Sequence, residues 1–319
     1  MAIATRALGR NGPNVSAVGL GCMGMSEFYG RSDRGASLAT IAAALEHGVS
    51  LFDTGDFYGM GHNEMLLAEA VQGRRDEAFI QVKFGPQRGP DGSFLGIDAR
   101  PAATKTALAY SLRRLGTDHV DLYQTGLDPA VPIEDTVGAI GELVQQGYVR
   151  HVGVTNVDGE TIRRAHAAHP ITAVQLEYSL MSRDMERDIL PVCRELGIGI
   201  TAYGVLGRGL LTGSKGSGEG DVRNTFYPRF QDQNLSHNER LAAALASVAE
   251  REGITAAQAA IGWVASQGGD IVPLVGARTV ARLTEALDAP LQLSASALAA
   301  IGEAVPEDAV RGDRSMAHG

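Results

Sequence analysis

The feature that most constrains this chain is a regular alternation of short apolar runs with longer amphipathic segments. Eight runs are typical of buried strands, at residues 17–21, 49–54, 78–84, 119–124, 151–156, 173–179, 197–204 and 271–276. Helical patterns lie between them, such as 100–116, with Pro101 near its start and Gly116 at its end, and 132–147. Short strand–helix–strand connections require parallel pairing, and eight such units close most simply into a (β/α)₈ TIM barrel. A doubly wound open sheet is the alternative.

Polar residues gather where these runs end. They are Asp53, Lys83, Gln124, Thr125, Thr155, Asn156, Gln175, Glu177 and Tyr203. In a barrel the carboxyl ends of the strands meet at one rim, where active sites lie. The alternative is that polar residues simply mark the entry into loops. Lys83 favours a site, because four of the six residues before it are apolar and it lies within its run.

Composition and length are compatible with one large core. The 319 residues are 44% hydrophobic and 20% charged, which is too balanced for extensive disorder. We therefore expect a single barrel domain over residues 1–319, preceded by a β-hairpin around "RNGPN" at 10–14. Residues 204–235 are rich in glycine and are expected to form a long loop over the site. Residues 306–319 are expected to form a flexible tail.

Charge and cysteine content exclude several classes of partner and location. The net charge of −9 and the pI near 5.4 argue against nucleic-acid or anionic-membrane binding. Cys22 and Cys193 provide neither a disulfide framework nor the spacing of a metal site. The N-terminal residues contain no apolar run long enough for a signal peptide or a membrane span. A cytoplasmic protein without a structural metal is the expectation.

The stretch "GLGCMG" at 19–24 matches the G-x-G-x-x-G pattern of a dinucleotide-binding turn. No helix pattern opens directly after it, and no acidic residue lies at the ribose position about twenty residues further on. We interpret it as a glycine-rich loop at the end of the first strand, which a ligand can approach closely.

Two of the polar residues and a nearby tyrosine can act together in one chemical step. A tyrosine delivers a proton to a carbonyl oxygen near neutral pH if a lysine cation acidifies its phenol, and a carboxylate keeps that lysine charged. Tyr58, Lys83 and Asp53 provide such a set on two neighbouring runs. At these residues the chain resembles the aldo-keto reductase family, whose "DTAxxYG" box is "DTGDFYG" here and whose lysine falls in "VKFG".

The resemblance covers almost the whole chain, through "SLRRLGTDHVDLYQ" and "QLEYSLMSRDMERDILPVCRELGIGI" to "LGRGLLTG", and is strongest to the potassium-channel β-subunit-like and short-chain aldehyde reductase branch. It implies a barrel that holds NADPH extended along the rim, with Asp53, Tyr58 and Lys83 as catalytic residues. It places Asn156 and Gln175 on the nicotinamide carboxamide and Tyr203 against the ring. The other implied cofactor contacts are Gly21, Cys22, Met23, Asp53, Thr155, Gly204, Leu206, Gly207, Gly209, Gly276, Arg278 and Arg282.

Arg278 and Arg282 also have a physical argument for their place. They are four residues apart in a helical pattern after the eighth run, and so are expected on one helix face near its N-terminus, where anions bind. The resemblance assigns them to the ribose 2′-phosphate. Ala286 stands where relatives carry an asparagine at the adenine, which weakens the expected grip on the cofactor.

The chain departs from the family in "DLYQTGLDP" at 121–129. Gly126 stands where relatives have a histidine that orients the carbonyl, and the segment is one residue shorter. His119 and His62 are expected to be structural. Glycine at this position leaves room for a bulkier substrate, whose pocket is predicted to be lined by Phe28, Phe57, Phe84, Thr125 and Gly126.

The sequence therefore predicts an NADPH-dependent reductase of a small aldehyde or ketone. The missing histidine leaves two other functions open, a nicotinamide-binding sensor or regulatory subunit with low turnover, and a reductase of a C=N or C=C bond. A small-molecule carbonyl compound is the expected partner, and a homo-oligomer is compatible with the sequence.

Overall fold

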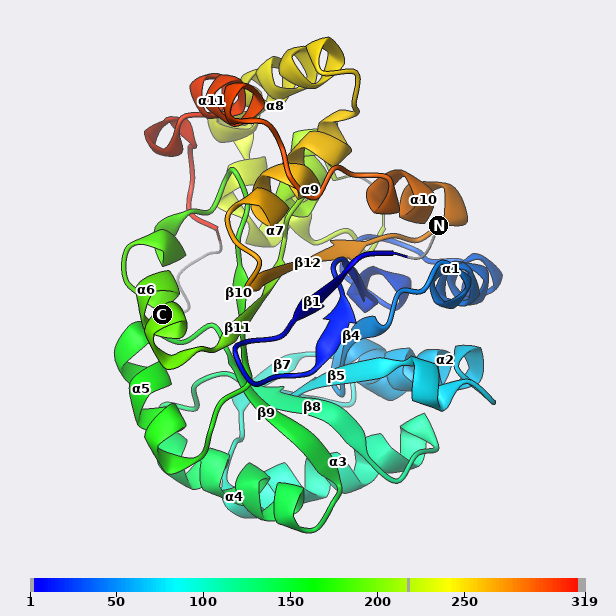
Figure 1. Ribbon diagram of the computed structural model, residues 1–319. Helices are drawn as coiled ribbons and strands as arrows, with labels where there is room; N and C mark the ends of the chain where they lie inside the picture. The colour runs from blue at the N-terminus through cyan, green and yellow to red at the C-terminus, as the bar shows by residue number, and fades with distance from the viewer. Residues whose placement is uncertain (1–2, 217–218, 315–319) are drawn as a thin grey trace.

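A computed structural model describes residues 3–216 and 219–314 and contains a closed barrel of parallel strands (Figure 1). In barrel order these strands are β3 (Gly19–Gly21), β4 (Leu51–Gly55), β5 (Phe79–Phe84), β8 (Val120–Thr125), β9 (Val149–Thr155), β10 (Ala173–Glu177), β11 (Gly199–Tyr203) and β12 (Ile271–Gly276). Each of the eight predicted runs contributes one strand. Pairing of β12 with β3 closes the barrel and excludes the open sheet.

Helices surround the barrel and follow its strands (Figure 1). They are α1 (Arg34–Glu46), α2 (His62–Ala70), α3 (Pro101–Leu115), α4 (Ile133–Gln145), α5 (Gly159–Ala168), α6 (Ile189–Leu196), α7 (Arg223–Phe226), α8 (Asp232–Arg251), α9 (Ala256–Ser266), α10 (Val280–Leu287) and α11 (Ala295–Ala304). Sequence signals set their ends. Pro101 is the first residue of α3, and Gly116 ends that helix in the left-handed conformation, at φ 62°.

The predicted N-terminal hairpin is present and covers the end of the barrel where the strands begin. It pairs β1 (Thr5–Ala7) with β2 (Asn14–Ser16). Leu8 and Val15 pack into the barrel interior together with Leu51 and other inward side chains. The N–H of Arg10 donates to the carbonyl of Gly197, which fixes the hairpin to the segment before β11. The hairpin therefore closes one end of the barrel and leaves the other for the site.

Strand alternation decides which side chains face the barrel interior. Leu51 and Leu122 belong to the interior cluster, and Asp53 and Gln124, two positions further along the same strands, also point inward. The residues between them, such as Phe52 and Tyr123, pack outward against the helices in the larger core cluster. The interior thus changes from apolar to polar toward the carboxyl ends of the strands.

Two segments differ from the expected long loop and tail. Residues 204–235 are partly helical, with the 3₁₀ turns η5 (Gly207–Thr212) and η6 (Pro228–Phe230) in addition to α7, while 217–218 lie outside the described residues. Part of the expected flexible tail is held in place, because the amide of Asn238 donates to the carbonyl of Arg311 at 2.8 Å and the guanidinium of Arg229 donates to the carbonyl of Gly312 at 3.1 Å. Residues 315–319 lie outside the described part of the chain.

A second hairpin was not predicted from the sequence. It pairs β6 (Pro86–Arg88) with β7 (Phe94–Ile97) directly after β5, on the side of the barrel where the strands end. Among the described residues, no helix is long and apolar enough to cross a membrane.

Candidate active site

A cavity of about 630 Å³ opens at the carboxyl ends of the barrel strands. Sixteen residues predicted for the site line it, namely Gly21, Met23, Phe28, Asp53, Phe57, Tyr58, Lys83, Asn156, Gln175, Tyr203, Gly204, Leu206, Gly209, Gly276, Arg278 and Arg282. They come from segments distributed along almost the whole sequence. The fold therefore brings most of the predicted site together in one hollow.

The charged centre of this cavity is the ion pair of Asp53 and Lys83. Lys83 Nζ donates to both carboxylate oxygens of Asp53, at 2.6 and 2.7 Å. The amides of Gln81 and Gln175 donate to Asp53 Oδ1 at 2.9 and 2.7 Å. Burial lowers the pKa of Lys83, and Asp53 acts against that shift. The carboxylate is thus fully paired and holds the lysine in one position.

Tyr58 lies beside this pair in the 3₁₀ turn η2 (Tyr58–Gly61), which directly follows β4. The N–H of Asp56 donates to the carbonyl of Lys83 at 2.9 Å, which ties the approach to this turn to β5. Lys83 Nζ lies 4.9 Å from the centre of the Tyr58 ring. The ring of Phe57 meets that of Tyr58 edge to face, with centroids 4.8 Å apart. No described residue makes a hydrogen bond to the Tyr58 hydroxyl, so the group is available to a ligand.

The prediction that Lys83 acidifies Tyr58 is not what the structure gives. Burial raises the pKa of Tyr58 well above its ordinary value, and the negative charge of Asp53 raises it further. Lys83 lies beside the ring, but its positive charge is largely offset by Asp53, whose two oxygens accept its hydrogen bonds, so it does not bring the pKa of Tyr58 below the ordinary value. Tyr58 is therefore a neutral phenol throughout the physiological pH range.

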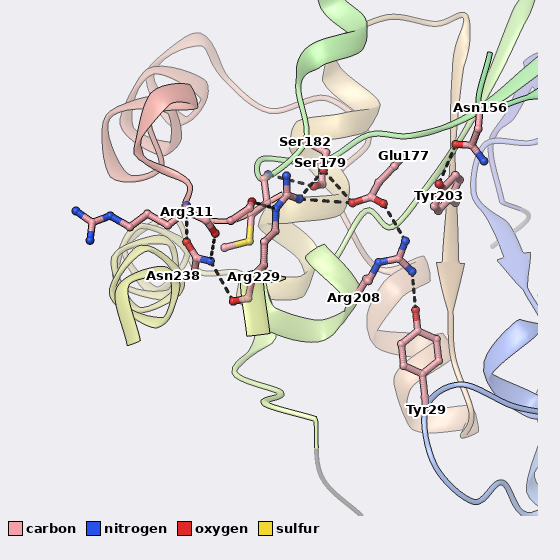
Figure 2. Close-up of polar contacts among 12 residues, drawn as sticks. Tyr29, Asn156, Glu177, Ser179, Ser182, Tyr203, Arg208, Arg229, Asn238 and Arg311 are labelled. Carbon is pink, nitrogen blue, oxygen red and sulfur yellow. Dashed lines mark hydrogen bonds and ion pairs between the residues drawn. The ribbon is translucent and has the colours of Figure 1, made fainter. Parts of the chain in front are cut away.

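Asn156, Gln175 and Tyr203 lie together on the next part of the rim. The Tyr203 hydroxyl donates to Asn156 Oδ1 at 2.9 Å (Figure 2). Asn156 has a left-handed backbone, at φ 53°, which asparagine adopts more readily than most residues. Gln175 uses its amide nitrogen for Asp53 and faces the cavity. This arrangement offers amide groups and a ring face to one planar ligand.

Two glycines in the cavity wall are not required by packing within the protein. Gly21 and Gly276 are paired across β3 and β12, and both line the cavity. A Cβ on either would meet its nearest neighbour only at 3.8 or 3.9 Å, which is ordinary contact. Packing within the protein does not require glycine here. A side chain at either position would instead take up space in the cavity.

Arg278 and Arg282 line the far part of the cavity, but not as one helical face. Thr279 caps the N-terminus of α10, so Arg278 precedes the helix and Arg282 lies in its first turn. Arg278 donates to the carbonyl of Tyr29 at 2.9 Å, and Arg282 pairs with Glu285 at 2.9 Å. Both arginines are exposed, which leaves their remaining donors accessible.

Three predicted residues lie outside the cavity because their side chains point away from it. Phe84 faces the helices and stacks on Tyr123 with ring centroids 4.3 Å apart. Thr125 is paired with Phe84 across β5 and β8 and therefore faces the same side of the sheet. Its hydroxyl donates to the carbonyl of Phe84 at 3.2 Å. Cys22 is buried behind β3, and its Sγ donates to the carbonyl of Leu20. Burial raises the pKa of this thiol, which makes it unreactive.

Three other predicted residues also fail to reach the cavity. Thr155 is buried beneath Asn156, whose amide donates to its hydroxyl at 3.2 Å. Gly207 faces the apolar side of its turn, where a Cβ would meet Met181 Sδ at 3.2 Å. Gly126 is only partly buried, and a Cβ there would meet the carbonyl oxygen of Thr155 at 3.3 Å. The described lining includes neither Gly126 nor a histidine.

Sequence reasoning missed Arg208 and Arg229, which form a second group of charges with Glu177 at the cavity. Arg208 lines it with a left-handed backbone at φ 57°, and donates to Glu177 at 2.9 Å (Figure 2). Arg229 lies 3.6 Å from the other oxygen of Glu177, which also accepts from Ser182. The described residues offer these two arginines no second carboxylate within ion-pairing distance, and Arg208 Nε is buried without a partner among them. Glu177 was among the polar residues predicted at the strand ends, and the signal for Arg208 was an arginine between two glycines in "LGRGLL".

Comparison with known proteins decides the family. The model of the Aldo/keto reductase family matches residues 17–306. The chain belongs to the aldo-keto reductase family. A probable aldo-keto reductase 1 of Glycine max is 41% identical over an alignment of 316 residues, and the match covers 96% of this chain and 90% of that protein. Membership makes the chain an oxidoreductase.

Solved structures of aldo-keto reductases resemble the chain over most of its length. A glycerol dehydrogenase of Gluconobacter oxydans is 28% identical with a TM-score of 0.85, and the match covers 95% of each chain. An aldo/keto reductase of Klebsiella pneumoniae, solved in complex with NADP and acetate, is 26% identical with a TM-score of 0.76, and the match covers 98% of this chain and 99% of that one. The TIM barrel is therefore shared with these enzymes.

Proposed function

We propose that this aldo-keto reductase uses NADPH to reduce an aldehyde or ketone to an alcohol, with Tyr58 as the proton donor. One observation carries the proposal. A single cavity joins the hydroxyl of Tyr58, which has no hydrogen-bond partner among the described residues, to an end that carries Arg278 and Arg282. The pair of Asp53 and Lys83 lies next to that hydroxyl. The Klebsiella relative with NADP supports the choice of cofactor.

The protein's part in the reaction follows from this arrangement. When bound, NADPH supplies the hydride that reaches the carbonyl carbon. The carbonyl oxygen then becomes far more basic than a phenolate, so the Tyr58 hydroxyl donates its proton to that oxygen despite its raised pKa. Lys83 stabilises the phenolate that remains, and Asp53 keeps Lys83 charged and in place.

Residues along the cavity would hold the cofactor by its successive parts. We assign Asn156 and Gln175 to the nicotinamide carboxamide, since Gln175 still has its amide oxygen free of Asp53. Tyr203 would stack on the ring. The open space at Gly21 and Gly276 suits close approach by a ligand.

We assign separate arginines to the diphosphate and to the 2′-phosphate of NADPH. We assign the diphosphate to the turn around Leu206 and Gly209, where Arg208 has an unpartnered buried Nε within the described structure. Arg278 and Arg282 would bind the ribose 2′-phosphate. A charge-assisted contact of this kind favours NADPH over NADH by about 1 to 3 kcal/mol, roughly ten- to hundred-fold in affinity.

The direct test is to mix the purified protein with NADPH and a panel of aldehydes and ketones, and to follow the absorbance of the reduced nicotinamide. Consumption of NADPH with formation of the alcohol is expected, with NADH bound more weakly. Tight NADPH binding without turnover of any carbonyl compound would instead support the nicotinamide-binding sensor. Equal dissociation constants for NADPH and NADH would contradict the roles of Arg278 and Arg282.

A further inference from the structure

The loop between β3 and α1 presents Phe28 to the cavity in an unusual conformation. Phe28 has a left-handed backbone, at φ 74°, which is unfavourable for a bulky side chain. Its ring lines the cavity that also contains Phe57 and Tyr58. A residue in this conformation keeps its place only if the surrounding structure holds it.

An arginine from the second hairpin holds the ring. The guanidinium of Arg88, on β6, lies 5.6 Å from the centre of the Phe28 ring. Arg88 is itself fixed by two bonds, one to Glu27 Oε2 at 2.6 Å and one to the carbonyl of Gly92 at 2.9 Å. Glu27 directly precedes Phe28, so the ion pair connects the hairpin to the residue that carries the ring.

The backbone of Phe28 is fixed from the other side. Its carbonyl accepts a hydrogen bond from the N–H of Val222 at 3.1 Å. The next residue, Tyr29, forms an isolated β-bridge with Asp221. The carbonyl of Phe28 is therefore tied to the segment before α7, while its ring is tied to the hairpin after β5.

The ion pair of Glu27 and Arg88 is largely removed from water. The two side chains are 22% and 18% exposed. Glu27 Oε1 and Arg88 Nε are each buried without a partner among the described residues. Removal of one member of such a pair leaves an uncompensated, poorly solvated charge, so the local structure is expected to rearrange.

We propose that Glu27 and Arg88 are positioning residues that set the size of the carbonyl substrate. Their ion pair holds Phe28 as the wall of the cavity beside Phe57 and Tyr58, and thereby limits the space next to the proton donor. This inference rests on the proposed carbonyl reduction. Neither residue touches the reacting atoms.

The first test compares a bulky aryl ketone with a short aliphatic aldehyde. Arg88→Met keeps an apolar side chain against Phe28 but removes the charge, and Glu27→Gln removes the partner charge with the smallest change in shape. Each is expected to raise the ratio of kcat/KM for the ketone to kcat/KM for the aldehyde by at least about tenfold, mainly through KM, since one pocket contact changes discrimination by that order. Arg88→Lys keeps the charge and should restore part of the parental ratio.

The matched control is Arg164→Met, which breaks the exposed pair of Arg164 with Glu134 on the helical surface. It should leave the ratio unchanged. An unchanged ratio in Glu27→Gln, in folded protein that still reduces the aldehyde, would overturn the inference and leave the proposed function intact.

A second measurement does not depend on turnover. Amide hydrogen exchange over residues 26–30 should be at least about tenfold faster in Arg88→Met and Glu27→Gln than in the parent, and unchanged in Arg164→Met, because local opening controls exchange. Equal exchange in all four proteins would show that the ion pair does not hold Phe28. If the parent reduced no carbonyl compound, the proposed function would fail, and the exchange data would still decide whether the pair fixes the loop.

Discussion

Two buried groups of charges lie at the same cavity, which Asp53 and Lys83 line from one group and Arg208 from the other, and they are balanced differently. Asp53 and Lys83 form a pair of one anion and one cation, with two amides completing the carboxylate. Glu177 is instead shared between Arg208 and Arg229, so that group has two cations for one anion (Figure 2). Both carboxylates are almost completely buried.

The difference in net charge indicates that the two groups have different roles. A balanced pair has no net charge to attract an anionic ligand, and in the proposed function Asp53 instead fixes the Lys83 cation beside the Tyr58 ring. A group with one surplus positive charge favours an anionic ligand at the cavity wall. In the proposed function, this difference in charge balance separates proton transfer at Tyr58 from phosphate binding at Arg208.

The largest effect is expected where the balanced pair meets the proton donor. Tyr58→Phe removes the hydroxyl and keeps the ring, so reduction should slow by about two to four orders of magnitude, the usual range for general acid catalysis. Steady-state kinetics measure the loss, and the dissociation constant of NADPH serves as the control. If more than about a tenth of the activity were retained, water or another group would have to supply the proton.

Removal of each carboxylate should separate the two groups most clearly. Asp53→Asn and Glu177→Gln each leave buried cations without their partner, which should lower the free energy of unfolding by about 3 to 5 kcal/mol. Inorganic pyrophosphate should raise the melting temperature of Glu177→Gln, because it binds the freed arginines, and should have little effect on Asp53→Asn. Thermal unfolding with and without pyrophosphate measures this. An equal response of both variants would contradict the assignment of the phosphate to the arginine group.

The surplus charge itself is tested at Arg208. Arg208→Gln removes a charged hydrogen-bond donor worth about 1.5 to 3 kcal/mol, so the dissociation constant of NADPH should rise by roughly ten- to hundred-fold. Arg229→Gln is the matched comparison, since this residue shares Glu177 but does not line the cavity. Fluorescence titration with NADPH measures both. A stronger effect at Arg229 than at Arg208 would show that the cavity wall does not bind the diphosphate directly.

Gly126→His should change the kinetics less than these substitutions. Gly126 does not line the cavity, and a Cβ there is 3.3 Å from the Thr155 carbonyl oxygen, so a side chain requires a small shift of the backbone. We expect kcat/KM for a small aldehyde to change by less than about tenfold, below what one well-placed hydrogen bond in the transition state provides. A larger gain would mean that the imidazole reaches the carbonyl from this position.

The smallest effect concerns pH. Burial raises the pKa of Tyr58, so its proton stays bound as pH rises and is lost only above the ordinary phenol value of about 10. The rate of the reduction step in single turnover should therefore be nearly constant from about pH 6 to about pH 9. A decline centred near neutral pH would mean that Lys83 lowers the pKa of Tyr58 in the working enzyme.

Local sequence patterns predicted the helices and strands well. They predicted less well which side of a strand a single side chain faces. The eight runs, the start of α3 at Pro101 and the N-terminal hairpin follow from apolar periodicity and from proline and glycine signals. The hairpin of β6 and β7 was missed, because each strand is short and largely exposed and so has no apolar alternation. Phe84 and Thr125 were assigned to the cavity from their neighbours in sequence, although adjacent residues in a strand face opposite sides.

The sequence by itself determined the barrel and the family, and it predicted Asp53, Tyr58 and Lys83 as catalytic residues, because these inferences depend on periodicity and on short motifs that are local in the chain. Only the tertiary structure decided how the charges are shared. Glu177, Arg208 and Arg229 come from three separate segments, and Glu27 meets Arg88 across 61 residues of chain. Burial, which sets the raised pKa of Tyr58 and the strength of these ion pairs, depends on which segments pack together. No local pattern in the sequence carries that information.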